Sequence, residues 1–154
     1  MRFVCDSTVG KLAHLLRMCG LDTAYIKDAD PAVVISISRR EGRVILSRNS
    51  LFRELVLADS FLHLTFDDPD EQFRQLVSTL KLTLDESGIL TRCLECNQLL
   101  LSVEKESIRD RLFEFVAQTQ EKFLLCPDCD KIYWHGTHAK AMVNKLQRLK
   151  NEPG

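Results

Sequence analysis

Two short cysteine motifs, Cys93-Leu-Glu-Cys96 and Cys126-Pro-Asp-Cys129, decide how the second half of this 154-residue chain folds. Each motif spaces two sulfurs so that both can bind one side of a tetrahedral metal ion, and together they supply the four thiolates of a closed structural zinc site. Two disulfides or free core cysteines are the alternatives. A chain of this length can build a core without disulfides, and its start does not resemble a secretory signal. The pattern therefore predicts structural Zn²⁺ in a cytoplasmic protein.

The composition is that of a globular protein with an uneven charge distribution. Hydrophobic residues make up 45% of the sequence, and no apolar run is long enough to span a membrane, so we expect no membrane partner. Behind the net charge of −1, cationic residues are in excess over 1–54 and 136–154, and acidic residues over 55–90. Basic faces of this kind can bind polyanions, although charge alone fits ordinary solvated helix faces equally well.

Short apolar runs alternate with helix-forming segments over the first 84 residues. Strands are expected at 2–5, 23–27, 43–46 and 61–66, and helices at 10–19, 33–38, 50–58 and 68–80. The segment 33–38 is rich in β-branched residues and could form a strand. We interpret it as a buried helix because a proline-containing cap precedes it and a clear strand follows. Strands alternating with helices predict parallel pairing and an α/β layer fold.

The pattern changes after Leu80. The turn-rich stretch Asp85-Glu-Ser-Gly88 predicts a joint between an α/β domain over 1–84 and a zinc-ribbon module over 85–154. Short strands are expected around each cysteine pair, including 131–134, with one amphipathic helix over 108–119 between them. Thr137 is expected to cap a final helix with an apolar stripe of Met142, Val143, Leu146 and Leu149.

Polar side chains follow the predicted strands of the first part. In a parallel sheet, the loops that leave the carboxyl ends of the strands line the ligand crevice. Converging carboxylates there would hold Mg²⁺ or Mn²⁺ and support phosphodiester hydrolysis. Most of these acids serve equally well as helix caps or exposed loop residues, whereas Asp6, at the end of an apolar strand, has to find partners. The candidates are Asp6, Asp28, Asp30, Asn49, Asp67 and Asp68.

Motifs from the first strand to the last helix point to one family. They are Phe3-Val-Cys-Asp6, Gly10-Lys-Leu-Ala13, Leu16-Arg17, Gly20-Leu-Asp22, the segment 42–48, Glu71-Gln72, the segment 92–97, the second cysteine pair and Tyr133-Trp-His-Gly-Thr-His138. These stretches resemble the Mut7-C RNase domain family. The resemblance implies a PIN-like nuclease fold, a parallel sheet flanked by helices, fused to a C-terminal zinc ribbon. Members of that family occur as small proteins and as the C-terminal domain of Mut-7-type 3′–5′ exonucleases, which act in RNA silencing.

The chain departs from that family where catalysis would be decided. The resemblance implies catalytic positions at Asp6, at Asp30 and after the third strand, where the family usually has Thr-Arg-Asp. This chain has Ser47-Arg48-Asn49 instead. An amide coordinates a hard cation without adding charge, so Asn49 lowers the expected affinity for Mg²⁺. The acidic pair usual at the next helix start is also reduced, because Pro31 follows Asp30.

Basic and aromatic residues are the candidates for RNA contacts. Cations on the first helix and around the third strand would contact phosphates: Lys11, Arg17, Arg39, Arg40, Arg43 and Arg48. Tyr133, Trp134 and His135 either stack on unpaired bases or pack the ribbon against the α/β layer. His135 and His138 are not expected to bind the metal, because four cysteines complete the site. Cys5 and Cys19 are interpreted as small buried apolar residues.

Three functions fit this sequence. The first is an RNA-binding accessory domain of a ribonuclease whose own catalytic site is weakened. The second is an active metal-dependent ribonuclease that uses Asp6 and Asp30 and tolerates Asn49. The third is a module that docks a protein partner in an RNA-processing assembly. Asn49 separates the first two, and an exposed hydrophobic groove would favour the third.

Overall fold

A four-stranded parallel sheet forms the first part of the chain in the computed structural model, which describes residues 1–151. Its strands are β1 (Phe3–Cys5), β2 (Thr23–Tyr25), β3 (Val44–Ser47) and β4 (Phe61–His63), in the spatial order β2-β1-β3-β4. Each neighbouring pair is parallel. The predicted α/β layer with a parallel sheet is therefore confirmed, although the strands at 23–27 and 61–66 are shorter than expected.

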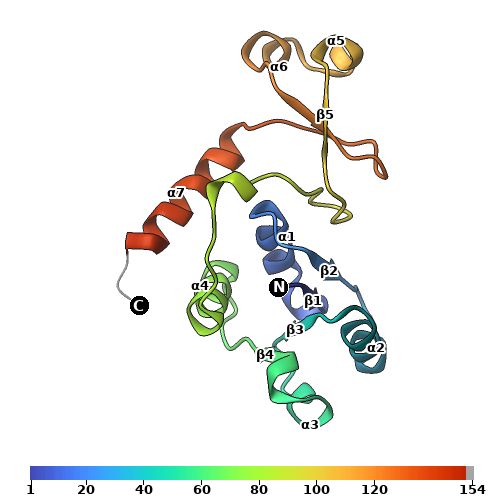
Figure 1. Ribbon diagram of the computed structural model, residues 1–154, viewed down its shortest axis with the longest axis vertical. Coiled ribbons are helices and arrows are strands. Elements are labelled where there is room, and N and C mark those ends of the chain that lie inside the picture. The colour runs from blue at the N-terminus through green and yellow to red at the C-terminus, as the bar shows by residue number, and fades with distance from the viewer. Residues whose placement is uncertain (152–154) are drawn as a thin grey trace.

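Helices cover both faces of this sheet (Figure 1). They are α1 (Gly10–Met18), α2 (Pro31–Glu41), α3 (Phe52–Leu55) and α4 (Pro69–Leu80), with 3₁₀ turns at Ser7–Val9, Ala58–Ser60 and Glu86–Gly88. The segment 33–38 is helical, as interpreted from the sequence, but it is only partly buried: Val34 and Ser38 are buried, whereas Val33 is 46% exposed. Asp30 and Asp68 cap α2 and α4 through their side chains, and each helix begins with a proline.

Alternation along the strands divides the core into two layers. Phe3 and Cys5 of β1 pack on the side of α1 and α4, whereas Val4 packs on the side of α2 and α3. These residues are fully buried, as expected where both faces of a parallel sheet are covered.

The second part of the chain is a small antiparallel ribbon followed by a long helix. The ribbon strands β5 (Leu101–Val103), β6 (Phe123–Leu125) and β7 (Ile132–Tyr133) pair in the order β5-β6-β7. The helices are α5 (Lys105–Ile108), α6 (Glu114–Thr119) and α7 (Thr137–Asn151), with a 3₁₀ turn at Arg109–Arg111. Figure 1 shows α7 returning from the ribbon towards α4, where Lys145 pairs with Asp70. Within residues 1–151, no helix has the length and apolar character that crossing a bilayer requires.

The single helix expected over 108–119 is wrong. The chain is extended at Leu112 and Phe113, which separates α5 and the following turn from α6. The residues that must be buried explain the break. Ile108 and Ala117 both face the interior, yet nine positions of one straight helix would place them about 180° apart. Two short segments bury both residues on the same side.

One core continues across the joint between the two parts. Residues of β1, α1 and α4 share a buried cluster with Cys93 and Cys126 of the ribbon and Met142 and Leu146 of α7. The joint itself packs closely against α1. The backbone N–H of Leu90 donates to the carbonyl of Met18 at 2.8 Å. The boundary between 1–84 and 85–154 stays a prediction.

The guanidinium of Arg17 bridges the sheet and the ribbon. Its Nε donates to the carbonyl of Thr23 at 2.9 Å, and its Nη1 donates to the carbonyls of Leu94 and Glu95 at 2.8 and 3.0 Å. Arg17 is 6% exposed. Nε and Nη1 are therefore engaged with backbone carbonyls, and this buried side chain is not offered to RNA.

A second polar contact joins the same two parts through Asp22. Its carboxylate accepts from Arg43 Nη1 and from Asn97 Nδ2, each at 2.7 Å, while Asn97 Oδ1 accepts from the Thr23 N–H at 3.0 Å. Burial raises the pKa of Asp22, but the hydrogen bonds from Arg43 and Asn97 outweigh burial and hold it below its usual range. Arg43 is 9% exposed, so this side chain also has a structural role and is not available to contact RNA.

Replacing Arg17 with methionine tests this bridge. Arg17→Met should lower the free energy of unfolding by about 3 kcal/mol, because it leaves buried carbonyls of β2 and the ribbon without their charged donor. Urea unfolding followed by circular dichroism measures the change. Arg39→Met, which removes an exposed cation of α2, should stay within about 0.5 kcal/mol of wild type. Equal effects of the two substitutions would contradict the bridge.

Candidate metal centre and nucleic-acid interface

The four cysteine sulfurs of the ribbon lie together. Sulfurs of Cys93, Cys96, Cys126 and Cys129 all fall within 4.8 Å of one another, and those of Cys96 and Cys126 are 3.4 Å apart. Four thiolates bound to one tetrahedral ion at about 2.3 Å lie about 3.8 Å from each other. The cluster therefore fits a single metal ion, and the cysteines are not joined in disulfides.

The two cysteine pairs form matching turns, which we call the first knuckle (residues 93–97) and the second knuckle (residues 126–130). In each, the residue after the second cysteine adopts a left-handed conformation, with φ of 73° at Asn97 and 59° at Asp130. Its N–H donates to the carbonyl of the first cysteine at 2.9 Å in both turns. This shared geometry points both pairs of sulfurs at one position.

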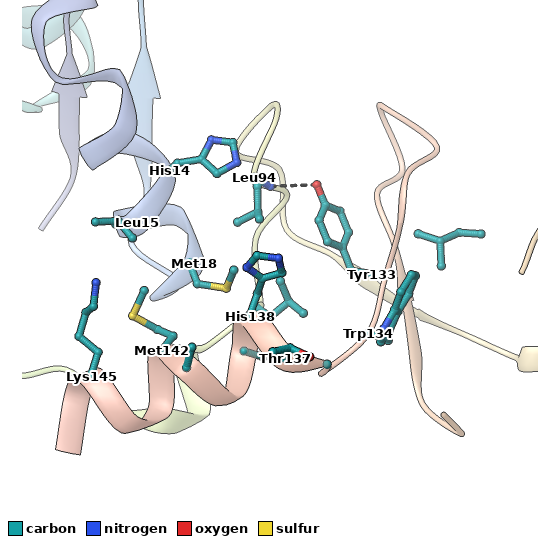
Figure 2. A pocket seen from close by; sticks show the side chains of 15 residues that line it. His14, Leu15, Met18, Leu94, Tyr133, Trp134, Thr137, His138, Met142 and Lys145 are labelled. Carbon is teal, nitrogen blue, oxygen red and sulfur yellow. Dashed lines mark hydrogen bonds between the residues drawn. The ribbon is translucent and has the colours of Figure 1, made fainter. Parts of the chain in front are cut away.

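Tyr133 of β7 orients the first knuckle. Its hydroxyl accepts from the Leu94 N–H at 3.1 Å, the contact drawn in Figure 2. The same hydroxyl lies 3.2 Å from Cys93 Sγ, a hydrogen bond in which either group can be the donor. Burial raises the pKa of Cys93, but hydrogen bonds from Tyr133 and from the backbone of the knuckle outweigh it and lower the pKa to about 7. A thiol with this pKa deprotonates readily, as metal binding requires.

At the carboxyl edge of the sheet, Asp6 is the centre of a hydrogen-bonded cluster. Its carboxylate is 8% exposed and accepts from the Thr8 N–H at 3.0 Å and from the hydroxyls of Thr8 and Ser47. Those two hydroxyls in turn accept from the N–H groups of Arg48 and Asn49 at 3.0 and 2.9 Å. Asp6 is thus connected to the position of Asn49 through side-chain hydroxyls, without a direct contact between the two side chains.

The other polar candidates at this edge have local partners. Asp30 and Asp68 are helix caps, and Asn49 holds the start of the next turn. Among residues 1–151, the four cysteines are the one group of three or more acidic, histidine or cysteine side chains close enough to share an ion. The side-chain partners are the N–H of Ala32 for Asp30, of Asp70 and Glu71 for Asp68 and of Leu51 for Asn49, together with the Ser7 hydroxyl for Asp28 and Arg48 for Asp67.

The six predicted phosphate contacts separate into three pairs. Arg17 and Arg43 are buried in the contacts described above. Arg39 and Arg40 are exposed at the end of α2, beside Glu41, whose carbonyl accepts from Arg2 at the amino edge of the sheet. Lys11 and Arg48 are exposed at the opposite, carboxyl edge.

A groove of about 670 Å³ runs along the carboxyl edge. Its lining includes the hydroxyl residues Ser7 and Thr8, the cation Lys11, the imidazole of His14 and the ring of Tyr25. Gly10 lies in the floor, where a Cβ would approach the Tyr25 hydroxyl to 2.9 Å. A glycine is therefore needed for this ring to lie over the start of α1.

The aromatic residues after the second knuckle have different places. Tyr133 is buried against the first knuckle, whereas Trp134 is half-buried and meets the Phe123 ring edge-on at a centroid distance of 6.2 Å. His135 and His138 are exposed and are not part of the metal cluster. From the sequence, these rings are expected either to stack on unpaired bases or to pack the ribbon against the α/β layer. Trp134 packs within the ribbon and keeps part of its surface open.

A four-stranded parallel α/β layer joined to a four-cysteine ribbon is the class of protein that this fold and site define. The chain belongs to the Mut7-C RNAse domain family, whose sequence profile matches residues 1–146. This membership indicates a ribonuclease-related role. No significant match is found among curated proteins or among solved structures.

Proposed function

We propose that the chain is an RNA-binding accessory domain of a ribonuclease whose own metal-dependent catalytic site is weakened. The observation that carries the proposal is the carboxyl edge of the sheet, where one buried carboxylate, that of Asp6, already accepts three hydrogen bonds while Lys11 and Arg48 remain exposed. Family membership supports RNA as the ligand.

Charge at this edge argues against strong binding of Mg²⁺. The ion gives up its water reluctantly and is held in proteins by carboxylates together with substrate phosphates. Asp6 accepts three hydrogen bonds from Thr8 and Ser47, and the neutral side chain of Asn49 stands where a third charge would be needed. An ion binding here would have to displace these donors and would gain no charge from Asn49.

The same edge suits a phosphate backbone. Lys11 has no ion pair with any residue of 1–151, and Arg48 pairs only with Asp67, whose side chain is 87% exposed. An exposed pair of this kind is worth little in water, so a phosphate can replace Asp67 at small cost. The groove beside Lys11 leaves room for a single strand along α1.

The metal of the ribbon is proposed to be Zn²⁺. Four thiolates in a closed tetrahedral arrangement are the ligand set that structural zinc prefers, and the cluster has no open position for catalysis. This ion would hold the two knuckles together and thereby fix the ribbon against Arg17.

Protein docking is the second candidate function. Phe113 and Phe115 are 82% and 75% exposed and lie at α6, at the end of the ribbon far from the sheet in Figure 1. Large apolar side chains exposed together often mark a contact with another protein. This surface is separate from the carboxyl edge, so docking and RNA binding are compatible.

Zinc binding should be required for folding of the ribbon. The purified chain should contain one equivalent of zinc by elemental analysis, and Cys126→Ser should lose the ion and melt the ribbon, because structural zinc is typically worth about 10–16 kcal/mol. Cys5→Ala removes a buried thiol outside the cluster and should keep the metal. A folded wild-type sample without zinc would contradict the assignment.

RNA binding should depend on the carboxyl edge and not on the amino edge. The double variant Lys11→Ala/Arg48→Ala should bind single-stranded RNA more weakly and lower the slope of log K against log salt by about 1.4, because each lost phosphate contact contributes about 0.7. Arg39→Ala/Arg40→Ala removes the same charge from the other edge and should leave the slope unchanged. Fluorescence anisotropy at several salt concentrations measures both. Equal losses of affinity in the two double variants would show that RNA binding depends on net charge and not on the carboxyl edge.

Cleavage of RNA by the wild-type chain should be weak. With labelled single-stranded RNA, we expect little cleavage in Mg²⁺ and any residual activity to appear first in Mn²⁺, because the site lacks negative charge. Asn49→Asp should raise metal affinity, since it restores a carboxylate while keeping the cap on Leu51. Asp6→Asn retains the shape of the cluster and serves as the inactive control. Strong Mg²⁺-dependent cleavage by wild type that Asp6→Asn abolishes would make the chain an active ribonuclease.

A further inference from the structure

A second pocket, of about 680 Å³, opens where the two parts of the chain meet. It lies between α1, the first knuckle, β7 and the start of α7. Figure 2 shows its apolar floor, formed by the thioethers of Met18 and Met142 and by Leu94. Trp134 forms one wall, and the imidazoles of His14 and His138 reach the pocket from α1 and α7.

The charges around this pocket favour an anionic ligand. No Asp or Glu lines it, and neither α1 nor α7 contains an acidic residue in its sequence. The two helices carry instead a series of cations, of which Lys145 reaches the pocket while paired with Asp70 of α4. Apart from Arg17, which is buried in its contacts with the ribbon, the cations are Lys11 on α1 and Lys140, Lys145, Arg148 and Lys150 on α7.

The shape and the polar groups favour a flat, aromatic ligand. His14 and His138 are exposed, and neither ring has a hydrogen-bond partner among residues 1–151. Trp134 keeps an open surface because Gly136 lies beside it, where a Cβ would approach the indole Nε1 to 3.0 Å. A nucleobase satisfies these features together, with π faces for the indole and the thioethers and edge atoms for the imidazoles.

The pocket and the groove at the carboxyl edge lie next to each other along α1. His14 lines both spaces, and Lys11, which lies one turn earlier on α1, lines the groove. A strand whose phosphates lie against Lys11 can therefore direct its next base past His14 towards Trp134. The groove and the pocket are thus both lined by α1, a helix that carries no carboxylate.

We infer that this pocket is a subsite for an unpaired nucleobase of single-stranded RNA, with Trp134 as the stacking surface and His14 and His138 as its polar contacts. The inference rests on the proposed RNA binding at the carboxyl edge and assigns the position of one base. It also gives the ribbon a direct part in RNA binding, beside its structural role.

Trp134 is the sole tryptophan of the chain, so its fluorescence reports on the pocket directly. Unlabelled single-stranded RNA should quench this emission at saturation. A strand of equal length with abasic positions keeps its phosphates and should bind without quenching. His14→Ala/His138→Ala should weaken binding of the intact strand about tenfold, as expected when a base contact is lost. His135→Ala removes a neighbouring exposed imidazole that does not line the pocket and should bind as wild type does.

Anisotropy of labelled RNA, measured in parallel, separates the outcomes. Quenching that disappears with the abasic strand, that needs about tenfold more RNA in the double histidine variant and that is unchanged in His135→Ala supports the base subsite. Binding by anisotropy with unchanged Trp134 emission would overturn the subsite, leave RNA binding at the edge intact and point to a protein ligand for the pocket. Failure of both strands to bind would overturn the proposed RNA binding and the subsite with it.

Discussion

The buried guanidinium of Arg17 connects the two parts of this molecule. A charge that leaves water must be compensated by hydrogen bonds, and Arg17 finds them on the carbonyl of Thr23 in β2 and on the carbonyls of Leu94 and Glu95 in the first knuckle. The position of the knuckle is thereby fixed relative to the sheet. Asn97 adds a second connection at the end of the same knuckle, because its side chain binds both Asp22 and the backbone of Thr23.

These contacts make the metal site and the sheet depend on each other. The four sulfurs determine the path of the first knuckle, and that path places the carbonyls that Arg17 needs. The buried cluster that contains Cys93 and Cys126 also includes residues of α1, so loss of the metal would disturb the packing against α1 as well as the ribbon. The RNA path proposed here follows from this arrangement, since the groove belongs to the sheet and the base pocket requires the ribbon and α7.

Local patterns in the sequence were sufficient for the elements of the parallel sheet and its helices and for the metal cluster. Cysteine spacing predicted four converging sulfurs, and Asp-Pro caps predicted the starts of α2 and α4. The role of Arg17 could not be predicted in this way, because its partners lie in a knuckle far along the chain and a cation on a helix looks the same whether it binds a carbonyl or a phosphate. A usable signal did exist: Arg17, Asp22 and Asn97 all lie in the stretches that carry the family resemblance, yet none has a part in cleavage chemistry. The break at Phe113 was missed because it reflects which residues the ribbon buries.

The central claim, that the metal-bound knuckle and the sheet form one structure through Arg17 and Asn97, is tested most directly by amide hydrogen exchange with and without the metal. Two amides decide the outcome. The Thr23 N–H belongs to the sheet but donates to Asn97, whereas the Leu46 N–H lies in the centre of the sheet, on β3. Removal of the metal by a chelator should sharply reduce the protection of Thr23, together with that of the ribbon amides, and should affect Leu46 much less. Unchanged protection of Thr23 in a metal-free sample with an unfolded ribbon would contradict the account.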